Sequence, residues 1–185
     1  MKASRRSRVS RVSLFGRALL VSAAAIASVA AAAPLDLATA TIPEVQAAYA
    51  KGSVTAKALT QAYLARIAAY DKQGPAINAV ITLNPKAVEQ AQALDAERRA
   101  GTVRGPLHGI PIVLKDNFDT FDLPTSGGSQ LLLGSIPPDD AFVVKKLRDA
   151  GVVILAKVNL HEFAYGGGAP NGYRSLGGQT HNPHD

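Results

Sequence analysis

The 185-residue chain contains no cysteine and no tryptophan, and aromatic residues make up only 5% of it. Without cysteine it cannot form a disulfide framework, a thiolate nucleophile or a cysteine-ligated zinc site. Many proteins that bind nucleic acid carry a basic patch with interleaved aromatic side chains, and the sequence contains no such patch. We therefore expect neither disulfides nor binding to nucleic acid.

Acidic residues are missing from the first 33 positions, where six basic residues are followed by an apolar, alanine-rich run over 18–32. The sequence Ala31-Ala32-Ala33 before Pro34 is typical of a signal-peptide cleavage site. We predict a signal peptide over residues 1–33 and export of the mature protein to the periplasm or the medium. If the leader is instead retained as an anchor, it would attach the protein to a membrane.

The excess of positive charge also lies in this leader. The whole sequence has 20 basic and 14 acidic residues, and six of the basic ones lie in the leader, so residues 34–185 carry no net charge. The high isoelectric point therefore gives no indication of a nucleic acid partner. The remaining length, about 150 residues, is enough for one hydrophobic core.

Apolar spacing and turn residues predict alternating helices and strands. Helices are predicted to begin at a capping box over Thr41–Glu44, at Ser53 or Thr55, at Asn84-Pro85, at Asp139-Asp140 and, for one short helix, at Asn159. Strands are predicted over 77–83, 110–115 and 152–156, the last apolar enough to be buried on both faces. This alternation favours an α/β fold with a largely parallel sheet covered by helices.

One lysine stands at the end of the second predicted strand. In the segment Gly105–Asn117, Lys115 follows the mostly apolar residues 110–114. If these neighbours bury Lys115, desolvation lowers the pKa of its amine, which can then accept a proton near neutral pH. The alternative is a surface cation at the point where a buried strand ends, and the spacing alone favours this alternative.

Several segments of the chain resemble one known family in the same order. Residues 107–117, 123–129 and 140–162 resemble the amidase signature family, and 178–185 resembles the lead-in to that family's glycine- and serine-rich loop. The resemblance extends from about Thr41 to Asp185. It implies a mixed sheet wrapped in helices and a Ser–cis-Ser–Lys triad that hydrolyses amides, or transfers ammonia from them, without a metal or cofactor. By this resemblance Lys115 is the triad base, and the partner is a small-molecule or peptide amide substrate.

The sequence departs from the family at the nucleophile. In the family both triad serines follow a segment like 178–185, and neither lies within these 185 residues. We therefore expect residues 34–185 to form the N-terminal part of an amidase domain and the 185-residue chain alone to be inactive. One alternative is a truncated fragment with at most binding capacity. Another is an enzyme in which Lys115 forms a Schiff base with a carbonyl substrate.

The turn Ser126-Gly127-Gly128-Ser129 combines hydroxyl groups with glycines that expose backbone N–H donors. By the resemblance it lines the floor of the active site, and we predict substrate contacts at Ser126, Gly127 and Gly128. A nucleophilic serine at 126 or 129 and an ordinary glycine turn are the alternatives. Asp116 is expected to be engaged away from Lys115, because a nearby carboxylate would raise the pKa of that lysine.

The histidines do not show the spacing of a metal site. The chain contains no His-Glu-x-x-His pattern, and a proline between His181 and His184 prevents a helical arrangement of that pair. We therefore predict no metal site at these two histidines or at His108 and His161. The glycines 166–168 lie in a segment without a Walker lysine or a Rossmann spacing. This segment is therefore predicted to be a flexible loop beside a pocket.

Overall fold

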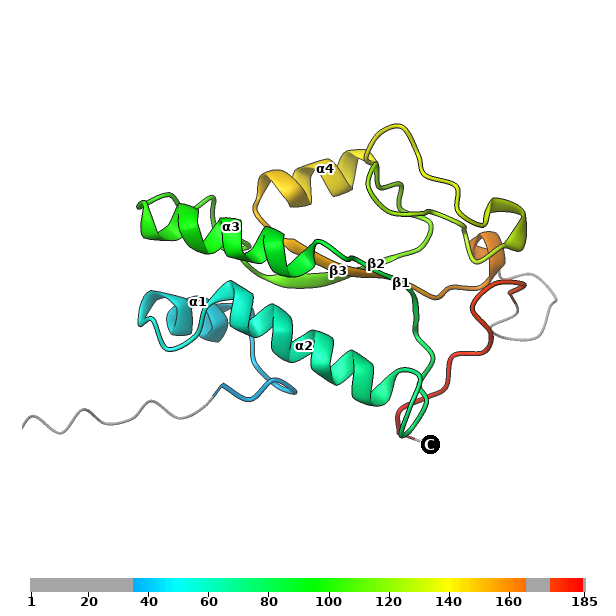
Figure 1. Ribbon diagram of the computed structural model, residues 1–185, viewed down its shortest axis with the longest axis horizontal. Coiled ribbons are helices and arrows are strands. Elements are labelled where there is room, and N and C mark those ends of the chain that lie inside the picture. The colour runs from blue at the N-terminus through cyan, green and yellow to red at the C-terminus, as the bar shows by residue number, and fades with distance from the viewer. Residues whose placement is uncertain (1–34, 166–173, 185) are drawn as a thin grey trace, which may run out of the picture. The chain divides into compact units, whose positions relative to one another are not determined.

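The computed structural model describes residues 35–165 and 174–184. The helices are α1 (Ile42–Ala50), α2 (Ala56–Tyr70), α3 (Ala87–Arg99) and α4 (Phe142–Asp149), with short 3-10 helices at η1 (Gln130–Leu132) and η2 (Glu162–Ala164). The strands are β1 (Val80–Leu83), β2 (Pro111–Lys115) and β3 (Val153–Val158) (Figure 1). The predicted leader and the glycines 166–168 lie outside the described residues.

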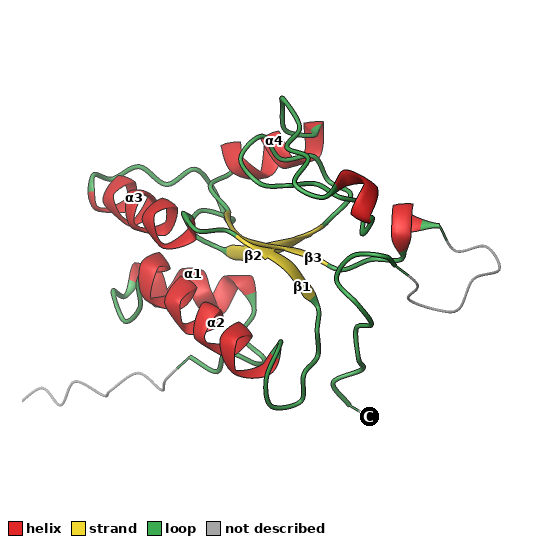
Figure 2. Cartoon of the chain, turned by 45° about the vertical axis from the view of Figure 1, so that its right-hand side comes forward, coloured by secondary structure: helices red, strands yellow, loops and turns green. Residues whose placement is uncertain are grey.

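β3 is the central strand of a three-stranded sheet with the order β1-β3-β2. It runs antiparallel to β1, with Leu83 opposite Ala156, and parallel to β2, with Lys115 opposite Val158. The sheet is therefore mixed, and Figure 2 shows it between helices, as the α/β interpretation predicts. All residues of β3 except the last are buried, which confirms that this strand is covered on both faces.

Two apolar clusters cover the two faces of the sheet. The larger cluster joins α1, α2 and α3 to one face and includes Leu59 and Val153. The smaller cluster joins α4 to the other face through Val144 and Ile154. The neighbours Val153 and Ile154 of β3 belong to different clusters, because successive side chains of a strand point to opposite faces. In Figure 1, α4 lies above the sheet and α1 and α2 lie below it, so the N-terminal helices pack outside the sheet as expected.

Two of the predicted helix starts are confirmed by a side-chain cap. The Thr41 side chain accepts from the backbone of Glu44 in a complete capping box, and Thr55 caps α2. The caps predicted at Asp140 and Asn159 are wrong. Asp140 instead forms an ion pair with Arg148 (Oδ2–Nε 2.9 Å) and accepts from a distant backbone N–H, and α4 begins without a side-chain cap.

The strand predicted from Ile77 begins only at Val80. Ala76 and Asn78 have φ values of 49° and 56°, which are incompatible with an extended strand. The backbone here pairs with the C-terminal segment instead: the backbone N–H of His181 donates to the carbonyl of Ile77 at 2.8 Å. Residues 177–181 therefore lie against the segment that leads into β1, about 100 residues earlier in the chain.

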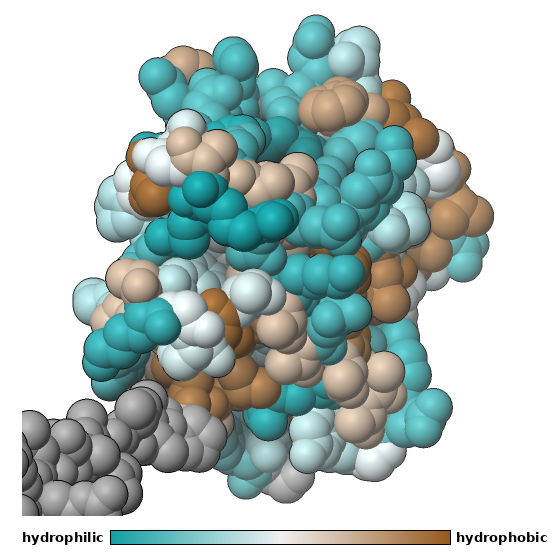
Figure 3. Space-filling view, turned by 60° about the vertical axis from the view of Figure 1, so that its left-hand side comes forward, coloured by the Kyte–Doolittle hydropathy of each residue, from teal (hydrophilic) through white to brown (hydrophobic). Residues whose placement is uncertain are grey.

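The surface alternates between polar and apolar areas. On the face shown in Figure 3, teal hydrophilic side chains are interrupted by brown apolar patches. The most exposed large apolar side chains are Leu131 (86%), Phe142 (79%) and Leu133 (69%). Among the helices of the described residues, none combines the length and the apolar character that crossing a membrane requires.

Gly109 marks the place where α1 and α2 approach the start of β2 most closely. Its φ of +81° is left-handed, and a Cβ would lie 3.0 Å from the Cβ of Ala56 and 3.3 Å from the ring of Tyr49. Gly101 has a similar φ of +85°, but no atom lies within 4 Å of a Cβ built there. The two glycines therefore separate the effect of backbone strain from that of close packing.

We expect Gly109→Ala to lower the free energy of unfolding by about 2–5 kcal/mol, because it adds a steric clash to the strain of a positive φ. Gly101→Ala should cost about 1–2 kcal/mol, which is the strain alone. Urea denaturation of the two variants measures the difference. Equal losses would contradict the close contact between Gly109 and the helices.

Candidate active site at the carboxyl end of the parallel strands

Lys115 is the last residue of β2, at the end where the parallel strands β2 and β3 both finish. In α/β sheets, ligands bind preferentially at the carboxyl ends of the parallel strands. The side chain of Lys115 is exposed. Of the two interpretations of the sequence, the structure therefore agrees with the surface cation and not with the buried lysine. The apolar neighbours do not bury Lys115 because β2 is an outer strand of the sheet, and Val113 on the same strand is also 47% exposed.

The buried lysine of this region is Lys157, in the central strand β3. Its Nζ donates to Thr125 Oγ1 (2.6 Å), to the carbonyl of Pro124 (3.2 Å) and to Thr120 Oγ1 (3.4 Å). It also lies 3.2 Å from Asp116 Oδ1. Burial lowers the pKa of Lys157, and the Asp116 carboxylate opposes part of that shift.

Asp116 connects this buried lysine to the predicted serine turn. Its side chain is 1% exposed, and its Oδ2 accepts from the backbone N–H of Ser126 at 3.0 Å and from the Ser126 hydroxyl. The backbone N–H of Asp116 donates to the carbonyl of Val158 at 2.9 Å. The carboxylate is thus engaged with Lys157 and Ser126, which confirms the expectation that it is used away from Lys115.

The backbone of the turn over 126–129 is attached directly to the end of β2. The N–H of Gly127 donates to the carbonyl of Asp116 (2.9 Å), and its own carbonyl accepts from the N–H of Phe163 (2.7 Å). At Gly128, φ is +75° and a Cβ would lie 3.1 Å from the side chain of Leu160. The close approach of the segment after β3 therefore requires glycine at this position.

Both hydroxyl groups of this turn are already engaged. Ser126 is 2% exposed, and its hydroxyl group donates a hydrogen bond to the Asp116 carboxylate. Ser129 is fully buried, and its Oγ accepts from the backbone N–H of Leu131 at 3.3 Å. These contacts favour a supporting wall over a nucleophile at either serine.

A hollow of about 390 Å³ lies beside the turn, at the same end of the sheet. Its polar lining comes from Asn117, Asp119, Thr125 and Ser135, and its remaining lining residues are Gly127, Leu132, Pro137 and Phe163. Gly127 is the one predicted contact residue that lines it. The mixture of apolar side chains with a few polar groups is typical of a site for a small organic molecule.

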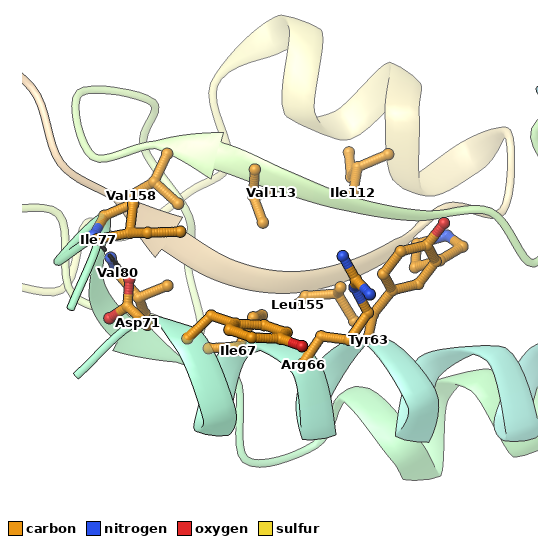
Figure 4. Close-up of a pocket in the computed structure, with 13 residues that line it drawn as sticks. Tyr63, Arg66, Ile67, Asp71, Ile77, Val80, Ile112, Val113, Leu155 and Val158 are labelled. Atoms are coloured by element: carbon orange, nitrogen blue, oxygen red, sulfur yellow. Dashed lines mark hydrogen bonds between the residues drawn. The ribbon is translucent and has the colours of Figure 1, made fainter. Parts of the chain in front are cut away.

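A second hollow, of about 610 Å³, lies on one face of the sheet between α2 and the strands (Figure 4). Ile67 and Tyr63 from α2 face Val113 and Leu155 from the sheet across it. Its 13 lining residues include no lysine, serine or histidine, so they offer no group of the kind predicted for the site.

A family model described as Amidase matches residues 58–185, about two thirds of the sequence. The chain belongs to the amidase family. The matched range contains Lys115, Asp116, the turn over 126–129 and Lys157, whereas α1 lies outside it.

Solved amidase structures share the fold of this chain. It is 48% identical to the native peptide amidase from Stenotrophomonas maltophilia, with a TM-score of 0.78 over 82% of this chain and 31% of that one. An amidase family protein from Bacillus anthracis is 38% identical, with a TM-score of 0.76 over 80% of this chain and 30% of that one. Among curated relatives, a glutamyl-tRNA(Gln) amidotransferase subunit from Acidothermus cellulolyticus is 46% identical over 81% of this chain and 29% of its own length. The chain thus spans about a third of the length of these amidase relatives.

The histidines of this amidase chain have separate surroundings. His108 is 1% exposed, and its Nε2 lies 2.9 Å from the carbonyl of Leu94 in α3. The ring of His161 lies 6.4 Å from that of Tyr165. Within the described ranges, no three histidine, aspartate or glutamate side chains form a group that could hold a metal ion.

Lys157 and its partners were not identified from the sequence. The available signal was a lysine directly after the run 152–156, which is apolar enough to be buried on both faces. If the strand extends to this lysine, the buried ammonium needs a counterion and hydrogen-bond acceptors. Asp116 and the threonines at 120 and 125 could have been considered as those partners. Only the parallel pairing of β2 and β3 brings them to Lys157.

We expect Asp116→Asn to lower the free energy of unfolding by about 3–5 kcal/mol near neutral pH, because it leaves the ammonium of Lys157 buried without a counterion. The matched control is Asp139→Asn, a carboxylate on the surface, which should change stability by less than about 0.5 kcal/mol. Chemical denaturation measures both. A loss as small as that of the control would contradict the buried ion pair.

The cost of Asp116→Asn should also depend on pH. Without the carboxylate, the pKa of Lys157 in the folded state falls further below the value of about 10.4 for lysine in an unfolded chain. Between these two values the unfolded state binds more protons, so stability rises with pH. We expect the difference from the wild type to shrink as the pH is raised from about 7 toward about 10. A difference that grows over this range would contradict the assignment.

Proposed function

We propose that the protein carrying this chain is an amidase that hydrolyses carboxamide bonds in small-molecule or peptide substrates, with Lys115 as the base of a Ser–cis-Ser–Lys triad. The observation that carries the proposal is the position of Lys115. It is exposed at the carboxyl end of β2 in a chain of the amidase family. The next residue, Asp116, is hydrogen-bonded to the glycine turn, and Gly127 of that turn lines a hollow sized for a small molecule. This combination supports a site at which Lys115 acts on a bound amide substrate.

In the proposed mechanism both serines come from the glycine- and serine-rich loop that the family resemblance implies after a segment like 178–185. Neutral Lys115 takes a proton from the bridging cis-serine, which takes one from the nucleophilic serine as the latter attacks the amide carbon. Return of the proton through the same relay releases the amine and leaves an acyl-enzyme. Water then attacks this ester and gives the carboxylic acid, while backbone N–H groups stabilise the oxyanion.

This mechanism requires a water-poor environment around Lys115. A lysine amine in water is protonated near neutral pH and cannot act as a base. Because the described residues leave Lys115 exposed, we propose that other parts of the complete domain cover it and provide the desolvation. Lysine suits the role because it needs no carboxylate to select a tautomer, unlike histidine.

This chain is 48% identical to the peptide amidase and 46% identical to the amidotransferase subunit. Export through the predicted leader, also proposed here, would favour peptide or small environmental amides over a charged tRNA. A secreted protein whose N-terminus is Pro34 would support export, and an N-terminus at Met1 in the cytoplasm would exclude it.

We expect Lys115→Ala in the complete enzyme to lower kcat for a primary amide by about 10²–10⁴-fold, which is the usual contribution of a general base. In the 185-residue chain, where this side chain is exposed, the same substitution should shift the melting temperature by no more than about 1–2 °C. Lys86→Ala, at another exposed lysine, is the matched control and should retain full activity. Ammonia release measures the rates, and a Lys115→Ala enzyme with a normal rate would refute the triad.

Two alternatives have separate tests. If the protein is a fragment with only binding capacity, neither the 185-residue chain nor its natural full-length product will release ammonia from any amide. If Lys115 forms a Schiff base, borohydride with a carbonyl substrate will attach the substrate to Lys115 irreversibly. An amidase with a lysine base gives ammonia release and no such adduct.

A further inference from the structure

Lys157 is a buried charged group that the proposed mechanism does not use. It lies in β3, the most buried strand of the sheet. In the pairing of β2 with β3, Lys157 is opposite Leu114 and Val158 is opposite Lys115. Its side chain is 0% exposed and that of Asp116 is 1% exposed. The pair therefore lies below the end of β2, inside the fold and out of contact with solvent.

We propose that Lys157 is a positioning residue for the amidase reaction, because its pair with Asp116 holds the turn over 126–128 against the end of β2 from which Lys115 projects. The inference rests on the proposed function for its catalytic consequence. Its structural part concerns only contacts between described residues and can be tested without any activity.

The contacts of Lys157 converge on one loop. The ammonium group approaches four oxygen atoms between residues 116 and 125, and these belong to Asp116, Thr120, Pro124 and Thr125. That loop connects Lys115 to the turn. A single side chain from β3 therefore determines the course of the backbone on the C-terminal side of Lys115.

Asp116 transmits this constraint in two directions. Toward the sheet, its N–H donates to the carbonyl of Val158, which fixes the residue that directly follows Lys115. Toward the turn, its carboxylate accepts from the N–H of Ser126, and its carbonyl accepts from the N–H of Gly127. Adjacent Cα atoms are only about 3.8 Å apart, so a constraint on Asp116 also limits the positions open to Lys115.

Stability alone does not account for this pair. Replacing a buried ion pair with uncharged side chains of similar volume often leaves a protein as stable or makes it more stable, because desolvating two charges is costly. What uncharged side chains do not reproduce is a directional contact with four oxygen atoms. A role in positioning therefore explains why charged groups occupy this part of the core.

The decisive variant is the double substitution Asp116→Asn with Lys157→Met, made in the complete enzyme. It removes both charges together, so it should recover most of the stability that either single substitution loses. The asparagine side chain can still accept from the N–H of Ser126, but the contacts of the ammonium are gone. We expect kcat to stay about 10–100-fold below the wild type with little change in KM, since a displaced base slows the chemical step. A purely structural pair predicts that kcat recovers together with stability.

The control is the double substitution Lys145→Met with Asp149→Asn, which removes an exposed ion pair on α4. It should leave kcat and KM unchanged. If the decisive variant does not fold, Thr125→Val removes the shortest hydrogen bond of Lys157 and keeps both charges. It should also lower kcat without raising KM, and a wild-type kcat in this variant would overturn the proposal.

The structural part is measured in the 185-residue chain by hydrogen exchange at the amides of Ser126 and Gly127. Both should exchange at least about 10-fold faster in the double variant than in the wild type, because their partner Asp116 is no longer held. The proposal requires faster exchange and lower kcat together, so either result without the other overturns it. A fully active Lys115→Ala enzyme would instead refute the triad, and the exchange measurement would still decide whether Lys157 holds the turn.

Discussion

Burial of β3 on both faces is the constraint on which the rest of the structure depends. The strand contributes Val153, Leu155 and Ala156 to one apolar cluster and Ile154 to the other, so helices α1–α3 and helix α4 are held on opposite faces of the same strand. Both outer strands pair with β3 and not with each other. Because β2 runs parallel to β3, the segments that follow these two strands leave the sheet at the same edge.

The candidate site consists of loops that this pairing brings together. The segment after β2, the turn over 126–129 and the segment after β3 are linked by backbone hydrogen bonds at Asp116, Gly127 and Phe163. The charged pair inside the sheet and the exposed lysine at its edge therefore belong to one arrangement. In our proposals one lysine acts as the base, and the other keeps its surroundings in place.

The sequence predicts those features whose causes are local. The capping box at Thr41 and the apolar run of β3 were identified because propensity and periodicity act over a few residues. The predicted caps at Asp140 and Asn159 were wrong because these side chains have other partners in the fold, as Asn159 does in Asn78, 81 residues away. The surface position of Lys115 also agrees with the local spacing. The contacts of Lys157 depend on the pairing of β3 with β2, and no local pattern contains that information.

The strand order has a consequence for synthesis of the chain. β1 and β2 leave the ribosome before β3, and each lacks a partner until residues 153–158 have been made. The sheet therefore forms late and through contacts between distant residues, which makes folding slow for a chain of this size. Until then both strands lack their pairing partner, and unpaired strand edges make a partly folded chain prone to aggregation.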